Sequence, residues 1–256
     1  MTLTERSSAR LQIGRVVIFM VQIIRLHLAP FLALSLFVVG IPGAVLRYQE
    51  DAYPDANMFW DLPVAIPFAA FVIAYSLLEA VITRMIVPDG AGQYTSLARS
   101  IEIVIRDIPL LSAIGLISTV LVLIGFFLLI VPGLILGAFL SVLIPVRTIE
   151  QTGFVRTFVR GIALTKGHRW AILILLTGSF ALQISATLVT NLVMGDPIFA
   201  GYSSEQQTGG AAAIIASVLS VSLLSVIGST GAAVVYCELR RIKDGPGPAA
   251  LASEFD

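Results

Sequence analysis

The stretch that decides the fold is IPLLSAIGLISTVLVLIGFFLLIVPGLILGAFLSVLIPV, which runs from Ile108 to Val146 without one charged residue. An α-helix rises about 1.5 Å per residue and the hydrocarbon core of a bilayer is about 30 Å thick, so one crossing needs about 20 apolar residues. The stretch is therefore long enough for two crossings. Because Pro132 cannot donate a helix hydrogen bond and Gly133 frees the backbone, Val131-Pro132-Gly133 predicts a tight turn between two antiparallel transmembrane helices.

The composition of the whole chain also fits a membrane protein. Charged residues make up 12% of the 256 residues and hydrophobic residues 57%, whereas soluble domains carry about 25% charged residues. Further uncharged apolar runs cover Leu28–Leu46, Leu62–Leu78, Trp170–Gly195 and Gly210–Cys237. Together with the two halves of the central stretch, they predict an all-α polytopic membrane protein with six transmembrane helices.

The basic residues fall almost entirely on one side of these six spans. All sixteen except Arg47 lie in the N-terminal segment, in the connections after the second and fourth spans, or after the sixth span. Arg47 shares the other side with acidic residues, among them Glu50, Asp51 and Asp61. Because cytoplasmic loops carry an excess of Lys and Arg, we expect both termini in the cytoplasm.

Three segments on this basic side have the pattern of amphipathic helices, which predicts that they lie in the headgroup layer. One is in residues 1–27, one near residues 96–108, and one near residues 153–166. The predicted organisation is an N-terminal interfacial helix in residues 1–27, a membrane domain in residues 28–244 and a short cytoplasmic tail in residues 245–256. Apolar residues share one face of the second and third helices, and charged residues the other: Leu97, Ile101 and Val104 against Arg99, Glu102 and Arg106, then Phe154, Phe158 and Ile162 against Arg156 and Arg160.

Three carboxylates lie within or beside the predicted spans. Glu79 directly follows the uncharged run Leu62–Leu78, and a carboxylate at the centre of a span costs about 2.5–3.5 kcal/mol on insertion scales. It is interpreted either as a proton, ion or headgroup site or as one half of a structural ion pair. Glu150 and Glu238 lie nearer to basic residues and carry the same two interpretations.

No catalytic or metal-binding motif stands in the sequence. His27 and His168 have no acidic or histidine partner at metal-ligand spacing, and the single Cys237 excludes an intramolecular disulfide. No serine lies in a Gly-x-Ser-x-Gly turn. We therefore expect no enzyme activity, no cofactor, no metal and no nucleic-acid partner.

Small residues at four-residue spacing, as at Gly133 and Gly137, indicate close helix packing within the chain or in a homo-oligomer.

The segment from Phe126 to Trp170 resembles the membrane domain found beside glycerophosphodiester phosphodiesterase catalytic domains in some bacteria and alone in others. The resemblance implies a standalone domain of the bacterial inner membrane, without the catalytic barrel, in a family that lacks a settled activity. The sequence departs from the family pattern at Gly161, where Ser is expected. The residues that carry the resemblance are Pro132-Gly133, Pro145-Val146, Glu150, Gly153, Arg160, Leu164-Thr165-Lys166-Gly167 and Tyr236-Cys237-Glu238-Leu239-Arg240.

These observations support three functional hypotheses. The first is a non-enzymatic membrane protein that organises or moves phospholipids, with basic residues on anionic headgroups. The second is a small-solute or ion transporter that uses Glu79, and the third is a membrane anchor for a partner protein. The headgroup candidates are Arg99, Arg106, Arg156, Arg160, Lys166 and Arg169.

Overall fold

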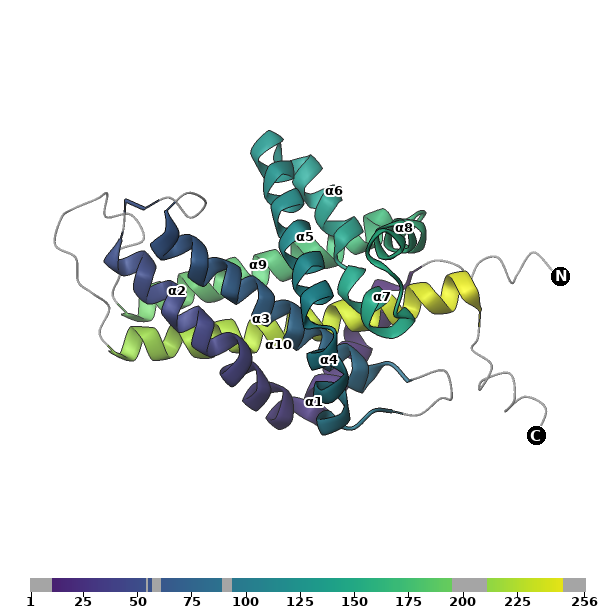
Figure 1. Cartoon of the computed structure of the whole chain (residues 1–256), viewed down its shortest axis with the longest axis horizontal. Coiled ribbons are helices and arrows are strands. Elements are labelled where there is room, and N and C mark those ends of the chain that lie inside the picture. The colour runs from purple at the N-terminus through teal and green to yellow at the C-terminus, as the bar shows by residue number, and fades with distance from the viewer. Residues whose placement is uncertain (1–10, 54, 57–60, 89–93, 195–210, 246–256) are drawn as a thin grey trace.

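The computed structural model describes residues 11–53, 55–56, 61–88, 94–194 and 211–245 (Figure 1). All regular secondary structure in these residues is helical, and six segments are long and apolar enough to cross a membrane, which confirms the predicted fold class. Residues 1–10 and the expected tail after Gly245 lie outside the described residues. The elements are α1 (Ile13–Ser35), the π-helix η2 (Leu36–Gly40), α2 (Ile41–Ala52), α3 (Leu62–Ile86), α4 (Leu97–Arg106), α5 (Ile108–Leu128), α6 (Ile130–Leu140), α7 (Leu143–Glu150), α8 (Phe154–Thr165), α9 (Arg169–Met194) and α10 (Ala211–Asp244).

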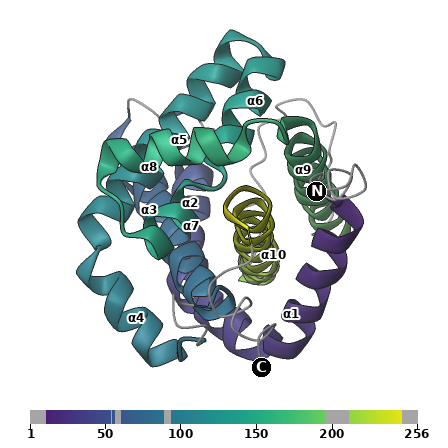
Figure 2. The same ribbon diagram turned by 90° about the vertical axis from the view of Figure 1, so that its right-hand side faces the viewer.

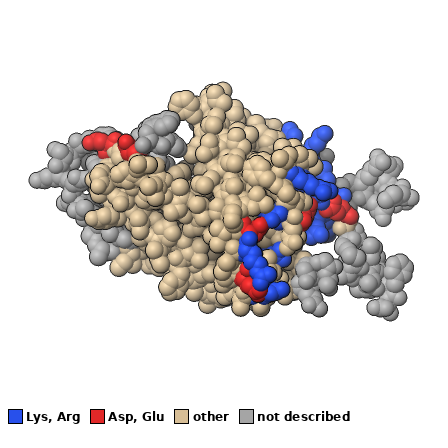
Figure 3. Space-filling view, in the orientation of Figure 1, with Lys and Arg blue, Asp and Glu red and all other residues tan. Residues whose placement is uncertain are grey.

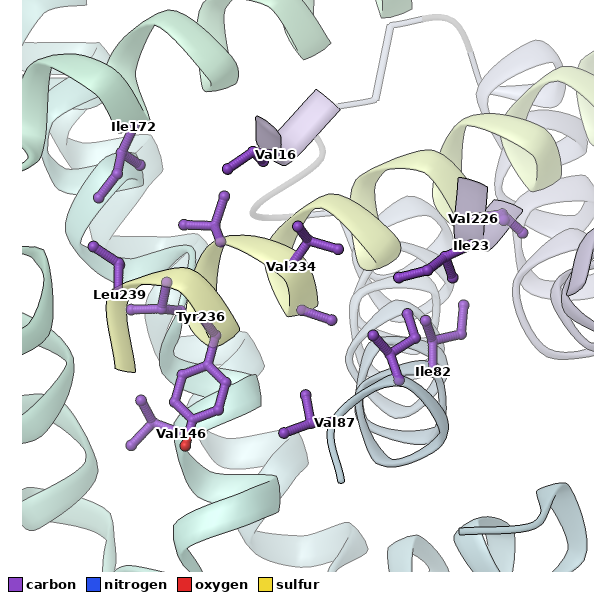
Figure 4. Packing of buried hydrophobic residues seen from close by; sticks show 14 of the residues in the cluster. Val16, Ile23, Ile82, Val87, Val146, Ile172, Val226, Val234, Tyr236 and Leu239 are labelled. Atoms are coloured by element: carbon purple, nitrogen blue, oxygen red, sulfur yellow. The ribbon is translucent and has the colours of Figure 1, made fainter. Parts of the chain in front are cut away.

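Helix α10 lies at the centre of the molecule. Figure 2 shows it end-on, with α1, α3, α7, α8 and α9 around it. It contributes Val226, Val234 and Leu239 to the main apolar core, where Ile23 of α1 and Ile82 of α3 also lie (Figure 4). The last span in the chain is therefore the one against which the first, second and fifth spans pack, whereas α5 packs against α3 and α6.

The N-terminal segment and the first span form one bent series of helices. Helix α1 continues through the expected boundary after residue 27, and the backbone leaves helical geometry only at His27 (φ −122°, ψ 19°). Pro30 explains the bend, because a proline cannot donate to the carbonyl one turn before it and its ring clashes there. The predicted interfacial helix and the predicted first span are thus joined by a kink at His27.

The uncharged stretch forms a helical hairpin from α5 and α6, and its turn differs in detail from the prediction. The chain reverses at Leu129 (φ −168°, ψ 152°), and Pro132 lies in the first turn of α6. Proline is tolerated there because first-turn N–H groups have no partner within the helix. Gly133 serves the packing of the two helices: a Cβ on Gly125 would lie 2.8 Å from the Gly133 Cα.

The hairpin leans away from the other spans (Figure 1). Near its tip, Phe126 of α5 contacts Phe180, which lies halfway along α9, at 6.0 Å between ring centroids. The fourth span is also interrupted after α6, at Ser141 and Val142, before α7 begins. Pro145 accounts for this break, since it has no N–H to donate to the Ser141 carbonyl.

Helices α4 and α8 lie across the end of the bundle where the C-terminus of α10 emerges (Figure 2). The apolar residues that the sequence analysis placed in the headgroup layer largely face protein instead. Val104 is buried in a second apolar core, and Leu97, Ile101, Phe154 and Phe158 pack against it. The hydrophobic faces of these two helices are therefore used first to close the end of the bundle.

Candidate functional site

Charged side chains gather at this same end of the molecule, which we call the basic end (Figure 3). Helix α8 forms part of it and is held by buried residues on its inner side, among them Thr157, Gly161 and Leu164. A Cβ on Gly161 would lie 2.5 Å from the Cδ2 of Leu143 in α7. Gly161, where the resemblance predicts Ser, therefore leaves room for the Leu143 side chain between α8 and α7.

Arg160, one of the headgroup candidates, forms an ion pair with Glu150, one of the three carboxylates singled out in the sequence. The Arg160 Nε donates to both carboxylate oxygens of Glu150, at 3.1 and 3.0 Å, and its Nη2 donates to Asp244. The Tyr236 hydroxyl donates to the Glu150 Oε1 at 3.2 Å. Partial burial opposes the charge of Arg160, but its hydrogen bonds to Asp244 and Glu150 outweigh burial and raise its pKa. Arg160 and Glu150 thus join α7, α8 and α10.

The carboxylate of Glu238 in α10 also forms ion pairs. It pairs with Arg241 at 2.6 Å and lies 3.7 Å from Arg15 of α1. Among the described residues, both Glu150 and Glu238 therefore form ion pairs between or within helices. Of the two interpretations given for them, this is the structural one.

Arg99 and Arg106 share one carboxylate on α4. Arg99 lies 2.6 Å from Glu102, and Arg106 lies 2.7 Å from its other oxygen. The hydrogen bond from Arg99, together with the two positive charges, lowers the pKa of Glu102. One of the two positive charges of α4 is therefore neutralised within the helix.

The other three headgroup candidates have no acidic partner within the described residues. Arg156, Lys166 and Arg169 are exposed, and no described carboxylate forms a hydrogen bond or an ion pair with them. The Arg169 guanidinium lies 4.5 Å from the centroid of the Phe139 ring, a cation–π contact that holds it beside α6.

Large apolar side chains lie exposed beside these three cations. Val155 and Val159 are 72% and 62% exposed, and Trp170 is 81% exposed. We define the α8–α9 corner as Val155, Arg156, Val159, Lys166, Arg169 and Trp170. Its chemistry, exposed cations next to exposed apolar and indole groups, suits the boundary between lipid headgroups and acyl chains.

The sequence analysis did not identify an ion pair between Asp107 and Arg147. The Arg147 Nε donates to the Asp107 Oδ2 at 2.7 Å, and its Nη1 donates to the Thr152 carbonyl at 2.5 Å. A signal existed in the sequence, since these are the charged residues that directly flank the uncharged stretch.

Glu79 lies within α3, and its side chain is only 7% exposed. Within the described part of the chain its carboxylate forms neither a hydrogen bond nor an ion pair. Tyr75 and Thr83 lie one turn before and one turn after it, on the same side of the helix. The structural ion pair that is one of the two interpretations of Glu79 is therefore not formed among the described residues.

No cluster of three or more His, Cys, Asp or Glu side chains that could hold a metal ion occurs among the described residues. Comparison of the chain with known protein families, with curated proteins and with solved structures found no match.

Proposed function

We propose that this protein is a non-enzymatic membrane protein that binds anionic phospholipids through the α8–α9 corner, as part of membrane organisation or lipid movement. One observation carries the proposal: three exposed cations without a described acidic partner lie beside exposed apolar side chains. Uncompensated cations at a membrane surface attract anionic headgroups by about 1 kcal/mol for each residue.

The residue types in the corner match a phosphodiester headgroup. Arg156 and Arg169 each present a planar fork that can hold a phosphate through two hydrogen bonds, and Lys166 adds a point charge. Trp170 supplies an indole, which favours the headgroup level of a bilayer. Val155 and Val159 would contact the upper part of the acyl chains.

We propose lipid binding by only three of the six headgroup candidates. Arg160 is held by two carboxylates of its own chain, and Arg99 and Arg106 share Glu102. A side chain held by a protein carboxylate must give up that partner before it binds a phosphate. We therefore assign the main part of lipid binding to Arg156, Lys166 and Arg169.

We infer that the basic end faces the cytoplasm, with the chain in a bacterial inner membrane. The basic residues at one end of the molecule (Figure 3) support this orientation through the positive-inside rule. Relationship to the phosphodiesterase-associated membrane domain is likewise a proposal. In its support, the shared-motif residues take defined roles: Glu150 pairs with Arg160, and Gly167 has a positive φ of 95° at the turn before α9.

The test is a triple variant, Arg156→Gln, Lys166→Gln and Arg169→Gln, purified in mild detergent. Mass spectrometry of the lipids that co-purify should show a loss of anionic phospholipid relative to zwitterionic phospholipid. Titration with phosphatidylglycerol, followed by Trp170 fluorescence in a Trp60→Phe background, should show weaker binding than in the protein with the three basic residues intact.

The matched control is Arg99→Gln with Arg106→Gln, which removes basic residues from the same end but from a helix with its own carboxylate. It should lose clearly less anionic lipid for each charge removed. Equal retention of anionic lipid by the triple variant and the unmodified protein would contradict the proposal.

A further inference from the structure

Glu79 belongs to a group of oxygen-bearing side chains, most of them buried, on two neighbouring helices of the membrane-spanning part of the fold. We call this group the polar seam, and it consists of Tyr75, Glu79 and Thr83 on α3 with Ser222 and Ser229 on α10. Helices α3 and α10 pack directly against each other. The Tyr75 side chain reaches from α3 to α10, since a Cβ on Gly228, the neighbour of Ser229, would lie 2.6 Å from the Tyr75 hydroxyl oxygen.

Most hydroxyl groups of the seam lack the hydrogen bonds that buried hydroxyls normally have. The side-chain oxygens of Thr83, Ser222 and Ser229 are fully buried, and none has a hydrogen-bond partner of regular geometry among the described residues. A Ser or Thr in a transmembrane helix can usually bond to the carbonyl one turn earlier, as Ser76 does with Val72 at 2.9 Å. These oxygens therefore have free lone pairs in a region without bulk water.

The backbone beside the seam is also irregular. The π-helix Leu36–Gly40 lies next to Ser222, since a Cβ on Gly40 would be 3.0 Å from the Ser222 Oγ. The Ser35 hydroxyl donates to the Ser222 carbonyl at 2.9 Å. Single-turn π-helices inside α-helices are frequent at functional sites.

The donor set points to the kind of ligand. It contains one carboxylate and several neutral hydroxyl oxygens, so the deprotonated carboxylate would balance one positive charge. A divalent cation generally takes more carboxylate ligands, and a thiol- or imidazole-binding metal has no such ligand in the seam. We propose that the polar seam binds one monovalent metal cation of the size of Na⁺, with Glu79 as the charged ligand and Thr83 and Ser229 as neutral ligands.

This inference is independent of lipid binding, because no residue of the α8–α9 corner belongs to the seam. The test measures the melting temperature of the purified protein while NaCl replaces choline chloride at constant ionic strength and constant pH. A ligand that binds only the folded state raises the melting temperature with increasing concentration. We expect a rise that is specific to Na⁺ over choline and that is lost in Glu79→Gln.

Two further variants allow the test to be decided even if Glu79→Gln does not fold. Thr83→Val keeps the shape of the side chain but removes a neutral ligand, and it should shift the Na⁺ response to concentrations at least several-fold higher. Glu102→Gln removes an exposed carboxylate from α4 and should leave the response unchanged. The inference is overturned if Na⁺ and choline act alike on the unmodified protein, or if Glu79→Gln or Thr83→Val keeps the full response.

Discussion

Asp107 and Arg147 form a two-pronged ion pair that joins the two ends of the longest uncharged stretch in the chain. Two guanidinium nitrogens of Arg147 reach the two carboxylate oxygens of Asp107, at 2.7 and 2.5 Å. Asp107 immediately precedes α5 and Arg147 lies in α7, so the pair closes the base of the α5–α6 hairpin. The hairpin leans away from the bundle, and this pair fixes the point from which it leans.

Loss of this pair should destabilise the protein. Asp107→Asn leaves the largely buried Arg147 guanidinium without its charged partner, and a hydrogen bond to a charged group contributes about 1.5–3 kcal/mol. We expect a loss of free energy of unfolding of that size, measured by denaturant titration in detergent micelles.

Arg147→Lys is the informative comparison, because a lysine keeps the charge but cannot reproduce the two-pronged geometry. It should recover less than half of the loss seen in Arg147→Gln. Full recovery by lysine would mean that charge alone, and not the planar fork, holds the base of the hairpin.

Gly161→Ser should lower stability, although serine is the residue that the resemblance predicts there. Its Cβ would lie 2.5 Å from the Leu143 Cδ2, and overpacking of a core costs about 1–3 kcal/mol. The matched control is Gly153→Ser at the start of α8, where a Cβ would meet no atom within 4 Å and where serine is a favourable N-cap. Thermal melting of the two variants should separate them, and equal melting temperatures would disprove the packing argument.

Gly228→Ala should destabilise the folded protein, because the added Cβ collides with one atom of Tyr75. The new Cβ would lie 2.6 Å from the Tyr75 hydroxyl oxygen but 3.8 Å from the ring carbon that bears it. Tyr75→Phe removes that oxygen, so the double variant should be more stable than Gly228→Ala alone. A double-mutant cycle on the free energy of unfolding measures this coupling, and strict additivity of the two changes would contradict it.

The orientation can be tested at two exposed tyrosines that lie at opposite ends of α3. Tyr53 follows α2 and is 49% exposed, and Tyr94 precedes α4 and is 71% exposed. In a Cys237→Ser background, Tyr53→Cys should react with an impermeant maleimide on intact cells, whereas Tyr94→Cys should react only after permeabilisation. The opposite pattern would invert the proposed topology.

The sequence was a good guide to elements set by local rules. Hydrophobic length predicted six membrane-spanning segments, and Pro30, Pro132 and Pro145 each lie within one turn of a bend, a helix start or a break. The exact role of a proline depended on context: Pro132 begins a helix because its position in the first turn needs no N–H donor.

The pairing of charges could not be predicted in the same way. Arg160 and Asp244 are far apart in the sequence and meet only because α10 returns through the centre of the bundle to α8. An amphipathic pattern is also ambiguous: the apolar faces of α4 and α8 could rest on lipid or on protein, and the buried core beneath them decides. The lack of a described partner for Glu79 is likewise a result of three-dimensional packing, and no local rule of the sequence predicts it.

The crosswise helices give the molecule two ends of unequal width. At one end α4, α7, α8 and the first part of α1 surround α10, whereas at the other only the ends of α2, α3, α9 and α10 meet (Figures 1 and 2). A wedge of this outline displaces more lipid area from one leaflet than from the other. From this outline we expect the protein to partition unequally between membranes of different curvature.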